Sequence, residues 1–334
     1  MAPVPRALAV SVMPLETRRE QFHALATLGE QLGYDAMLLP ETWAFDVTIV
    51  LAEAALKTQR LKVGSAILGV WNRTAATLAM GAATLASLSR GRFILGLGAS
   101  TPQLVEGLHD VPFGAPLGRM RQVVTQVRAL LRGERVPLAM ATQARALRLN
   151  VPAADVPICL AAIGDASVRL AGEIADGWMP FLYPLRMLEQ GRARLQEGAA
   201  RAQRASPPAI YPMVPAAVDD DPAKARASAA WFVSFYLTSM GTFYRDTLIR
   251  FGFDKQVQAV LAANTPKFAA VVPPEADVLL DELIVYGTPS QARDRLARWY
   301  EAGAAMPGLM FRANLTADET RHSLDAFVPM LQSR

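Results

Sequence analysis

Short apolar runs alternate with longer segments of helical periodicity along almost the whole of this 334-residue chain. A run that is apolar throughout is typical of a strand buried on both faces, and a helix after each such strand covers the sheet. Right-handed crossovers then lay the strands parallel and in chain order. The pattern predicts an α/β fold. The predicted strands are Ala7–Met13, Ala36–Glu41, Leu61–Leu68, Arg92–Ala99, Pro157–Ile163, Gly177–Phe181, Ile210–Val218 and Pro307–Arg312.

The segments between these strands are amphipathic or rich in alanine and are predicted to be helices: Leu15–Leu32, Asp46–Leu56, Thr74–Leu88, Leu117–Arg132, Asp165–Ala175, Leu185–Arg204, Pro222–Leu237 and Pro289–Ala302. Such strand–helix units fit a closed (β/α)8 TIM barrel better than an open doubly wound sheet, which is the alternative. Two segments fit no unit and are predicted insertions, after strands four and seven: Gly133–Val156, with a possible hairpin over Ala146–Asn150, and Thr238–Glu282. No linker divides the chain, so we expect residues 1–334 to form a single barrel domain.

Several helix boundaries are marked by capping residues. Asp165 follows the fifth apolar run and is expected to cap the next helix, and Asp221 precedes a proline at a first helical position. Gly33 and Gly303 are expected to end helices ahead of strands, because glycine adopts the left-handed conformation found at helix C-termini.

Composition excludes several classes of protein. With 52% hydrophobic and 19% charged residues, the chain is not disordered. Its one cysteine, Cys159, lies in an apolar run and is expected to be a buried hydrophobe, and three dispersed histidines predict no metal site. The 34 basic residues are scattered among 30 acidic ones, so we expect no nucleic-acid binding. No stretch has the length of a membrane span, and the first apolar run is interpreted as a strand, not a signal peptide. We therefore expect a cytoplasmic protein.

The active site of a barrel lies at the C-terminal ends of its strands. Here those ends are mostly small and apolar, and they lack the paired carboxylates of a glycosidase and the Ser/His/Asp set of a hydrolase. Such a site suits a flat cofactor that brings its own chemistry. The Gly96-Leu97-Gly98 run is not a Rossmann fingerprint, because Thr101 occupies the third glycine position. Its glycines are small either for packing or for the approach of a ligand, and we favour the ligand.

Each of the other candidate site residues has two interpretations, one structural and one functional. The Ala162–Ala166 junction is either a phosphate site, formed by backbone N–H groups, or an ordinary turn. Glu41 is either a solvent-facing cap or a ligand contact, and His109 is either a surface residue or catalytic. A set of aromatic residues at near-helical spacing is either a buried helix face or the wall of a substrate pocket: Trp231, Phe232, Phe235, Tyr236, Phe243 and Tyr244.

Two segments, Gly64–Ala75 and Ala83–Gly98, resemble the bacterial luciferase-like monooxygenase superfamily. The continuation, Ala99–Gly107, resembles the branch of that superfamily that uses the deazaflavin coenzyme F420. Leu170–Trp178 and Tyr286–Ala292 extend the resemblance, which runs from about residue 7 to residue 313 and so covers most of the chain.

The resemblance implies a TIM-like barrel with the cofactor at its mouth. It also implies a non-prolyl cis peptide, Ala66–Ile67 by position, that presses backbone against the central ring of the deazaflavin. The remaining matches are Gly164, Asp165 and Ala166 in the loop for the cofactor phosphate, Ala99, Ser100 and Gln103 in the wall near the cofactor, and Glu41 as an acidic contact from strand two. A homodimer is implied as well. The small-residue face of Thr74–Leu88 suits that contact, and it suits packing inside the monomer equally.

The chain departs from the family pattern at several positions. Thr42 and Thr101 stand where sugar-phosphate dehydrogenase members carry a catalytic histidine and a glutamate, so that activity is not expected. Ala75 replaces a frequent proline, and Ala86 replaces the usual aspartate of the Leu-Asp-x-Leu-Ser pattern.

Together, the residues and the resemblance predict an F420-dependent oxidoreductase. A hydride would pass between the deazaflavin and an apolar small molecule with an activated C=C, C=N or C=O bond, with Glu41, His109 and Tyr236 as candidate proton donors. One alternative keeps the fold but binds FMN and activates oxygen as a monooxygenase. Another is a catalytically silent cofactor-binding protein, suggested by the missing histidine and glutamate.

Overall fold

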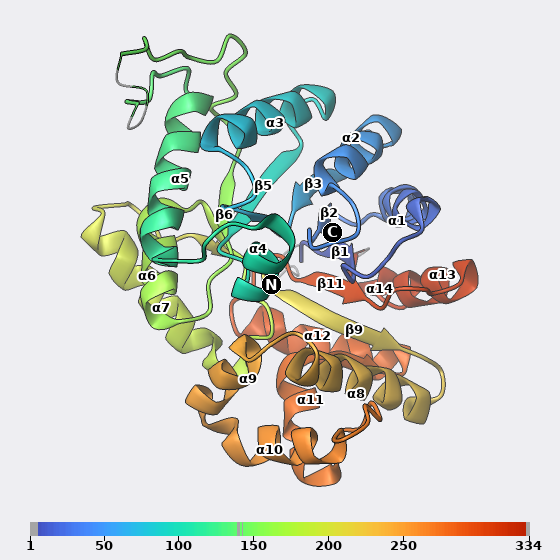
Figure 1. Ribbon diagram of the computed structural model, residues 1–334. Coiled ribbons are helices and arrows are strands. Elements are labelled where there is room, and N and C mark those ends of the chain that lie inside the picture. Colours follow the sequence, from blue (N-terminus) through green and yellow to red (C-terminus); the bar gives the residue numbers. More distant parts are fainter. Residues whose placement is uncertain (1–5, 139–140, 142, 332–334) are drawn as a thin grey trace.

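The computed structural model describes residues 6–138, 141 and 143–331, and it shows a barrel of parallel strands surrounded by helices (Figure 1). The strands are β1 (Ala9–Val12), β2 (Ala36–Leu39), β3 (Lys62–Ser65), β4 (Leu68–Gly69), β5 (Phe93–Gly98), β6 (Ile158–Leu160), β7 (Gly177–Trp178), β8 (Ala209–Ile210), β9 (Met213–Val218), β10 (Val285–Gly287) and β11 (Gly308–Phe311). They pair in the order β10-β9-β11-β1-β2-β3-β5-β6-β7-β8, with β4 beside β5.

The barrel closes because β8 and β9 belong to one continuous stretch of chain. β8 pairs with β7, while β9 pairs with β11. A bridge between Phe181 and Met213 and a hydrogen bond from Met213 N–H to Pro180 C=O (2.8 Å) join the two ends of the sheet. The predicted (β/α)8 barrel is thereby confirmed. Every predicted strand is present, although most are shorter than expected and two are split in two.

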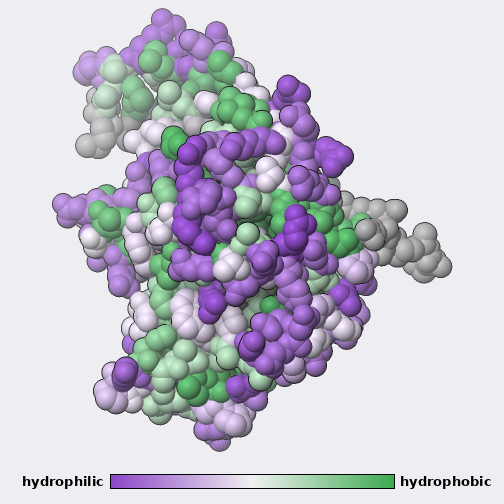
Figure 2. Space-filling model, turned by 90° about the vertical axis from the view of Figure 1, so that its right-hand side faces the viewer, coloured by the Kyte–Doolittle hydropathy of each residue, from purple (hydrophilic) through white to green (hydrophobic). Residues whose placement is uncertain are grey.

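The helices cover the outside of the barrel (Figure 1). They are α1 (Arg19–Leu32), α2 (Val47–Lys57), α3 (Ala75–Leu88), α4 (Pro102–His109), α5 (Pro116–Leu131), α6 (Asp165–Ile174), α7 (Leu188–Arg201), α8 (Pro222–Thr238), α9 (Phe243–Leu248), α10 (Asp254–Ala263), α11 (Val278–Leu283), α12 (Pro289–Glu301), α13 (Ala317–Asp325) and α14 (Val328–Leu331). On the face that carries α1 and α13, hydrophilic side chains surround scattered hydrophobic ones (Figure 2). The strands beneath are buried, as a sheet covered by helices requires.

Most predicted caps are present, but one is wrong. The Asp221 side chain accepts a hydrogen bond from Ala223 N–H, and Gly33 ends α1 with φ 92°. Asp165, however, does not cap α6. The N-cap residue is Gly164, and Asp165 is the first residue of the helix. Its carboxylate faces Arg194 on α7 (2.9 Å) instead of the helix's own N–H groups.

The two predicted insertions have different structures. The segment over 238–282 forms α9, α10 and α11, which lie together at one side of the barrel (Figure 1). The hairpin predicted for Ala146–Asn150 is wrong for the described residues there, since residues 143–150 form no strand. A strand that the sequence analysis did not predict, β10, pairs with β9 through Val285–Ala216, Tyr286–Ala217 and Gly287–Val218.

Close packing against β3 explains why residue 96 is a glycine. A Cβ atom at this position would lie 2.0 Å from the carbonyl oxygen of Ser65. The Ser65 hydroxyl donates to the Gly96 carbonyl (2.8 Å) and accepts from the Gly96 N–H (3.0 Å). Gly96 is therefore small because β3 packs against it, which corrects the expectation that it makes room for a ligand. Cys159 is fully buried in β6, as predicted. Among the helices of the described residues, none combines the length and the apolar character of a membrane span.

Candidate functional site

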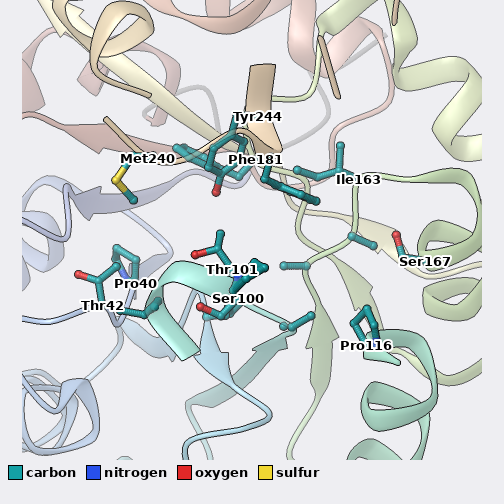
Figure 3. A pocket seen from close by; sticks show the side chains of 18 of the residues that line it. Pro40, Thr42, Ser100, Thr101, Pro116, Ile163, Ser167, Phe181, Met240 and Tyr244 are labelled. Carbon is teal, nitrogen blue, oxygen red and sulfur yellow. The ribbon is translucent and has the colours of Figure 1, made fainter. Parts of the chain in front are cut away.

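A cavity of about 940 Å³ opens at the C-terminal end of the strands. Its lower wall comes from the ends of β2, β3 and β5, its side from the loop between β6 and α6, and its upper wall from α8 and α9 (Figure 3). This volume lies toward the upper end of the range for small-molecule sites, roughly 300–1,000 Å³. The cavity is large enough for two ligands of modest size.

The structure brings nearly all the predicted site residues to this one cavity: Glu41, Ala66, Ile67, Ala99, Ser100, Gln103, Gly164, Asp165, Ala166 and Tyr236. His109 is the exception. It is the last residue of α4, is half-buried, and is not among the residues that line the cavity. Gly98 lines the cavity and also packs on Ile67, whose side chain would lie 2.9 Å from a Cβ atom at position 98.

Backbone forms the floor of the cavity between β3 and β4. The peptide bond between Ala66 and Ile67 is cis, at the position that the resemblance implied. Hydrogen bonds to β2 and to Glu41, just after it, hold both residues: Ala66 N–H donates to Leu39 C=O (2.7 Å), and Glu41 N–H donates to Ile67 C=O (3.3 Å). The floor is therefore fixed from the neighbouring strand and presents main-chain atoms to a ligand.

Glu41 is held in an ion pair beside this floor. Its two carboxylate oxygens accept from the Arg73 guanidinium at 2.5 and 2.8 Å, and one also accepts from Val47 N–H (3.2 Å) at the start of α2. The hydrogen bond to Glu41 raises the pKa of Arg73, with a smaller contribution from Asp46, which lies 2.8 Å away. This geometry makes Glu41 a positioned carboxylate, with both oxygens already occupied by donors.

The N-terminus of α6 opens into the cavity without a side-chain cap. The first N–H groups of a helix have no intrahelical partner, and with the helix dipole they attract anions. At Gly164 an added Cβ atom would meet only the Ser167 hydroxyl, at 3.8 Å, so the approach to these groups is open. The charge of Asp165 is directed to Arg194 and, at 3.8 Å, to Arg169. Ser167, which the sequence analysis did not select, also lines the cavity in this turn, and its hydroxyl donates to the Gly164 carbonyl (2.8 Å).

Aromatic rings form the upper wall. The Tyr236 ring lies 5.0 Å from Phe181 and 5.5 Å from Tyr244, and the Phe181–Tyr244 distance is 5.7 Å. All three pairs are edge-to-face, the arrangement that aromatic quadrupoles favour. Of the two interpretations of the aromatic set, the pocket wall holds for Tyr236, Phe243 and Tyr244, while Phe232 is buried in the core.

The family model described as luciferase-like monooxygenase matches residues 8–306. A putative coenzyme F420-dependent oxidoreductase of Mycobacterium tuberculosis is 34% identical over 86% of this chain and 89% of that protein. A 5,10-methylenetetrahydromethanopterin reductase of Methanolobus tindarius is 27% identical over 83% of this chain and 86% of the relative.

Solved structures share the fold. The coenzyme F420-dependent tetrahydromethanopterin reductase of Methanopyrus kandleri superposes with a TM-score of 0.83 at 19% identity, covering 98% of this chain and 99% of that one. The oxygenating constituent of 3,6-diketocamphane monooxygenase of Pseudomonas putida, in complex with FMN, superposes with a TM-score of 0.69 at 17% identity, covering 98% of each chain. At these identities the likeness establishes the fold alone.

Proposed function

This chain belongs to the luciferase-like monooxygenase family and is an oxidoreductase of that class, and from that premise we propose that it uses coenzyme F420. In this proposal a hydride passes between the deazaflavin and an apolar small molecule that carries an activated C=C, C=N or C=O bond. The relative named as a coenzyme F420-dependent oxidoreductase supports the cofactor, and the apolar cavity supports the substrate class.

The cavity fits the cofactor at both of its ends. Main chain at Ala66 and Ile67, on the floor of the cavity, gives a flat ring a surface to lie against, and the uncapped N-terminus of α6 gives a phosphate its N–H donors. We assign Ala99, Ser100 and Gln103 to the side of the ring, and Gly164, Asp165 and Ala166 to the phosphate. That both features line one cavity is the observation that carries the proposal.

When bound, the deazaflavin supplies the hydride, and the chain's own residues supply orientation. Glu41, held by Arg73, is hydrogen-bonded both to the floor and to the start of α2. These bonds fix the floor and so position the ring. Tyr236 remains a candidate proton donor because it lines the cavity. His109 lies outside the lining, and we leave it out of the proposed proton path. Holding both reactants in one apolar cavity lowers the barrier by avoiding the entropy cost of their encounter.

Cofactor binding tests the proposal against its FMN alternative, which has the same fold. The protein is titrated with F420 and, separately, with FMN, and quenching of cofactor fluorescence is measured. We expect F420 to bind with a micromolar dissociation constant and at least tenfold more tightly than FMN. Micromolar binding of FMN without binding of F420 would overturn the proposal.

We also propose a homodimer that uses α2 and α3. The two helices pack side by side. Their outer surface exposes Ile49 (66%), Leu56 (63%) and Met80 (59%), and Gly81 has open space where a side chain would be. Large apolar side chains exposed on two neighbouring helices are a feature of interaction surfaces. Sedimentation equilibrium is expected to give twice the mass of the monomer, and a Met80→Lys variant is expected to give the monomer.

A further inference from the structure

A second cavity lies at the end of the barrel where the strands begin. Its volume is about 340 Å³, near the lower end of the range for small-molecule sites. Lys62 and Phe93, which begin β3 and β5, line it together with Ala7, Pro157 and Asp176, which precede β1, β6 and β7. No residue of this lining belongs to the lining of the larger cavity, so the two are separate sites.

Lys62 lies on the inner face of the barrel. Side chains alternate between the two faces of a strand, so Lys62 shares a face of β3 with Gly64. A Cβ atom at Gly64 would lie 2.9 Å from side-chain atoms of both Leu38 and Ile94. Leu38 and Ile94 belong to the same buried cluster as Cys159 of β6, so this face is turned to the inside. As the first residue of β3, Lys62 is exposed at the entrance of the second cavity.

The lining carries positive charge that no carboxylate neutralises. Within the described part of the chain, the Lys62 ammonium forms no ion pair and no hydrogen bond. Arg92 donates to three backbone carbonyls and one hydroxyl, all of them neutral acceptors. Asp176 is the one carboxylate among the described lining residues, and it already accepts from Arg128 (2.9 Å) and from the Ile158 N–H (2.8 Å). The free charge of this cavity is therefore positive.

Arg92 is partly removed from water at this site. Burial lowers the pKa of Arg92, and the negative charge of Glu30 offsets only part of that effect. A cation that is desolvated without a carboxylate beside it gains from an anion that binds nearby.

Tyr211 adds a neutral donor. It is half-buried, and its ring is fixed by close packing, since a Cβ atom at Gly177 would lie 2.6 Å from the ring and 2.7 Å from Sγ of Cys159. Its hydroxyl forms no hydrogen bond with the described residues. Burial raises the pKa of Tyr211, so the phenol keeps its proton at physiological pH and can donate it to an acceptor. Lys62 and Tyr211 are thus exceptions at an end of the barrel where Arg92 and Asp176 have protein partners.

We propose that the second cavity binds a small organic monocarboxylate. Lys62 and the charge of Arg92 attract the carboxylate, and the Tyr211 hydroxyl donates to it. Ile94 and Met306, which also line the cavity, contact the apolar body of the ligand. Hydrogen bonds to an ionised acceptor are roughly twice as strong as those between neutral groups. The site does not depend on the proposed cofactor, because it lies outside the larger cavity.

Calorimetric titration of the full chain with benzoate and with benzamide tests the proposal, because the two probes have nearly the same shape and differ in charge. We expect benzoate to bind at least tenfold more tightly than benzamide. Lys62→Gln is expected to lower benzoate affinity about fivefold and to leave benzamide affinity unchanged. Tyr211→Phe is expected to lower benzoate affinity about threefold.

Arg250→Gln is the matched control, because Arg250 is the one cation among the described residues that line the larger cavity. We expect this variant to bind benzoate as the wild type does. Equal binding of the two probes by the wild type, or a Lys62→Gln variant with the full preference for benzoate, would overturn the proposal. A loss of benzoate affinity in Arg250→Gln would place benzoate in the larger cavity and would overturn it as well. Far-UV circular dichroism reports whether each variant is folded, and Tyr211→Phe, which removes a single oxygen atom, decides the matter if Lys62→Gln does not fold.

Discussion

The two ends of the barrel differ in how far their polar groups find hydrogen-bond partners within the protein. At the N-terminal end of the strands, Arg92 donates to the backbone carbonyls of Ala55 (2.9 Å), Thr58 (2.9 Å) and Leu61 and to the Thr58 hydroxyl (3.1 Å). The Glu30 carboxylate accepts from three consecutive backbone N–H groups, those of residues 59 to 61, at 2.8–3.0 Å. Side chains there close the loops that lead into the strands.

At the C-terminal end, Glu41 and Asp165 are paired with arginines, but some other polar groups have no protein partner among the described residues. The N-terminus of α6 has no side-chain cap, and Tyr236 and Tyr244 line the cavity, with the Tyr244 hydroxyl pointing into it (Figure 3). The N-terminal end of the strands therefore contributes mainly to stability and the C-terminal end mainly to binding, as is general for this architecture. We call the N-terminal end of the strands the closed end and the C-terminal end the open end. Substitutions of the paired groups at the closed end should lower the free energy of unfolding, while substitutions at the open end should change ligand affinity.

Arg92→Ala is expected to have the largest effect. It removes a charged donor from several half-buried carbonyls at once, and each charged hydrogen bond contributes about 1.5–3 kcal/mol. We expect the free energy of unfolding, measured by urea denaturation, to fall by about 3 kcal/mol, with F420 affinity unchanged in the folded protein. Arg90→Ala, which removes only a 3.5 Å contact with Gln59, is the control and should change stability by less than about 0.5 kcal/mol. Equal losses in the two variants would contradict the role of Arg92.

Gly164→Asp should show the reverse pattern at the open end. The glycine has φ −76° and open space beyond its Cα, so an aspartate fits without strain. Its charge would face the cofactor phosphate, and we expect F420 affinity to fall at least tenfold, about 1.4 kcal/mol, with little change in stability. Gly164→Ala, which adds no charge, is expected to bind as the wild type does. An unchanged affinity in Gly164→Asp would place the phosphate elsewhere.

Local signals explain why the sequence predicted the barrel. Apolar runs mark the strands, and caps such as Asp221 and Gly33 depend only on residues close in the chain. β10 was missed because a strand of three residues between two helices has no period to detect. The hairpin over 146–150 failed for a related reason, since so short an alternation is not enough to specify strand pairing.

Partners distant in the chain explain what could not be predicted at the site. Glu41 meets Arg73 from 32 positions away, and Asp165 meets Arg194 from 29 positions away. No local pattern gives such pairs, so Asp165 was mistaken for a cap. The aromatic set was recognised, but Tyr244 could be distinguished from its neighbours only when the fold directed its hydroxyl into the cavity.

Glu30→Gln tests the contribution of a carboxylate at the closed end, with an effect that depends on pH. Burial alone would raise the pKa of Glu30, but hydrogen bonds from the N–H groups of Leu61, Arg60 and Gln59 outweigh it and lower the pKa below 4.5. A carboxyl with a lowered pKa in the folded state stabilises the protein above the unfolded pKa and loses that contribution as the pH falls through the folded value. We expect Glu30→Gln to cost about 1 kcal/mol at pH 7 and clearly less at pH 3, by denaturant unfolding. Glu20→Gln, at an exposed position of the same helix, is the control. The same loss at both pH values would show that Glu30 acts through packing instead of charge. The carboxylates of the closed end would then contribute less to the free energy of unfolding than Arg92 does.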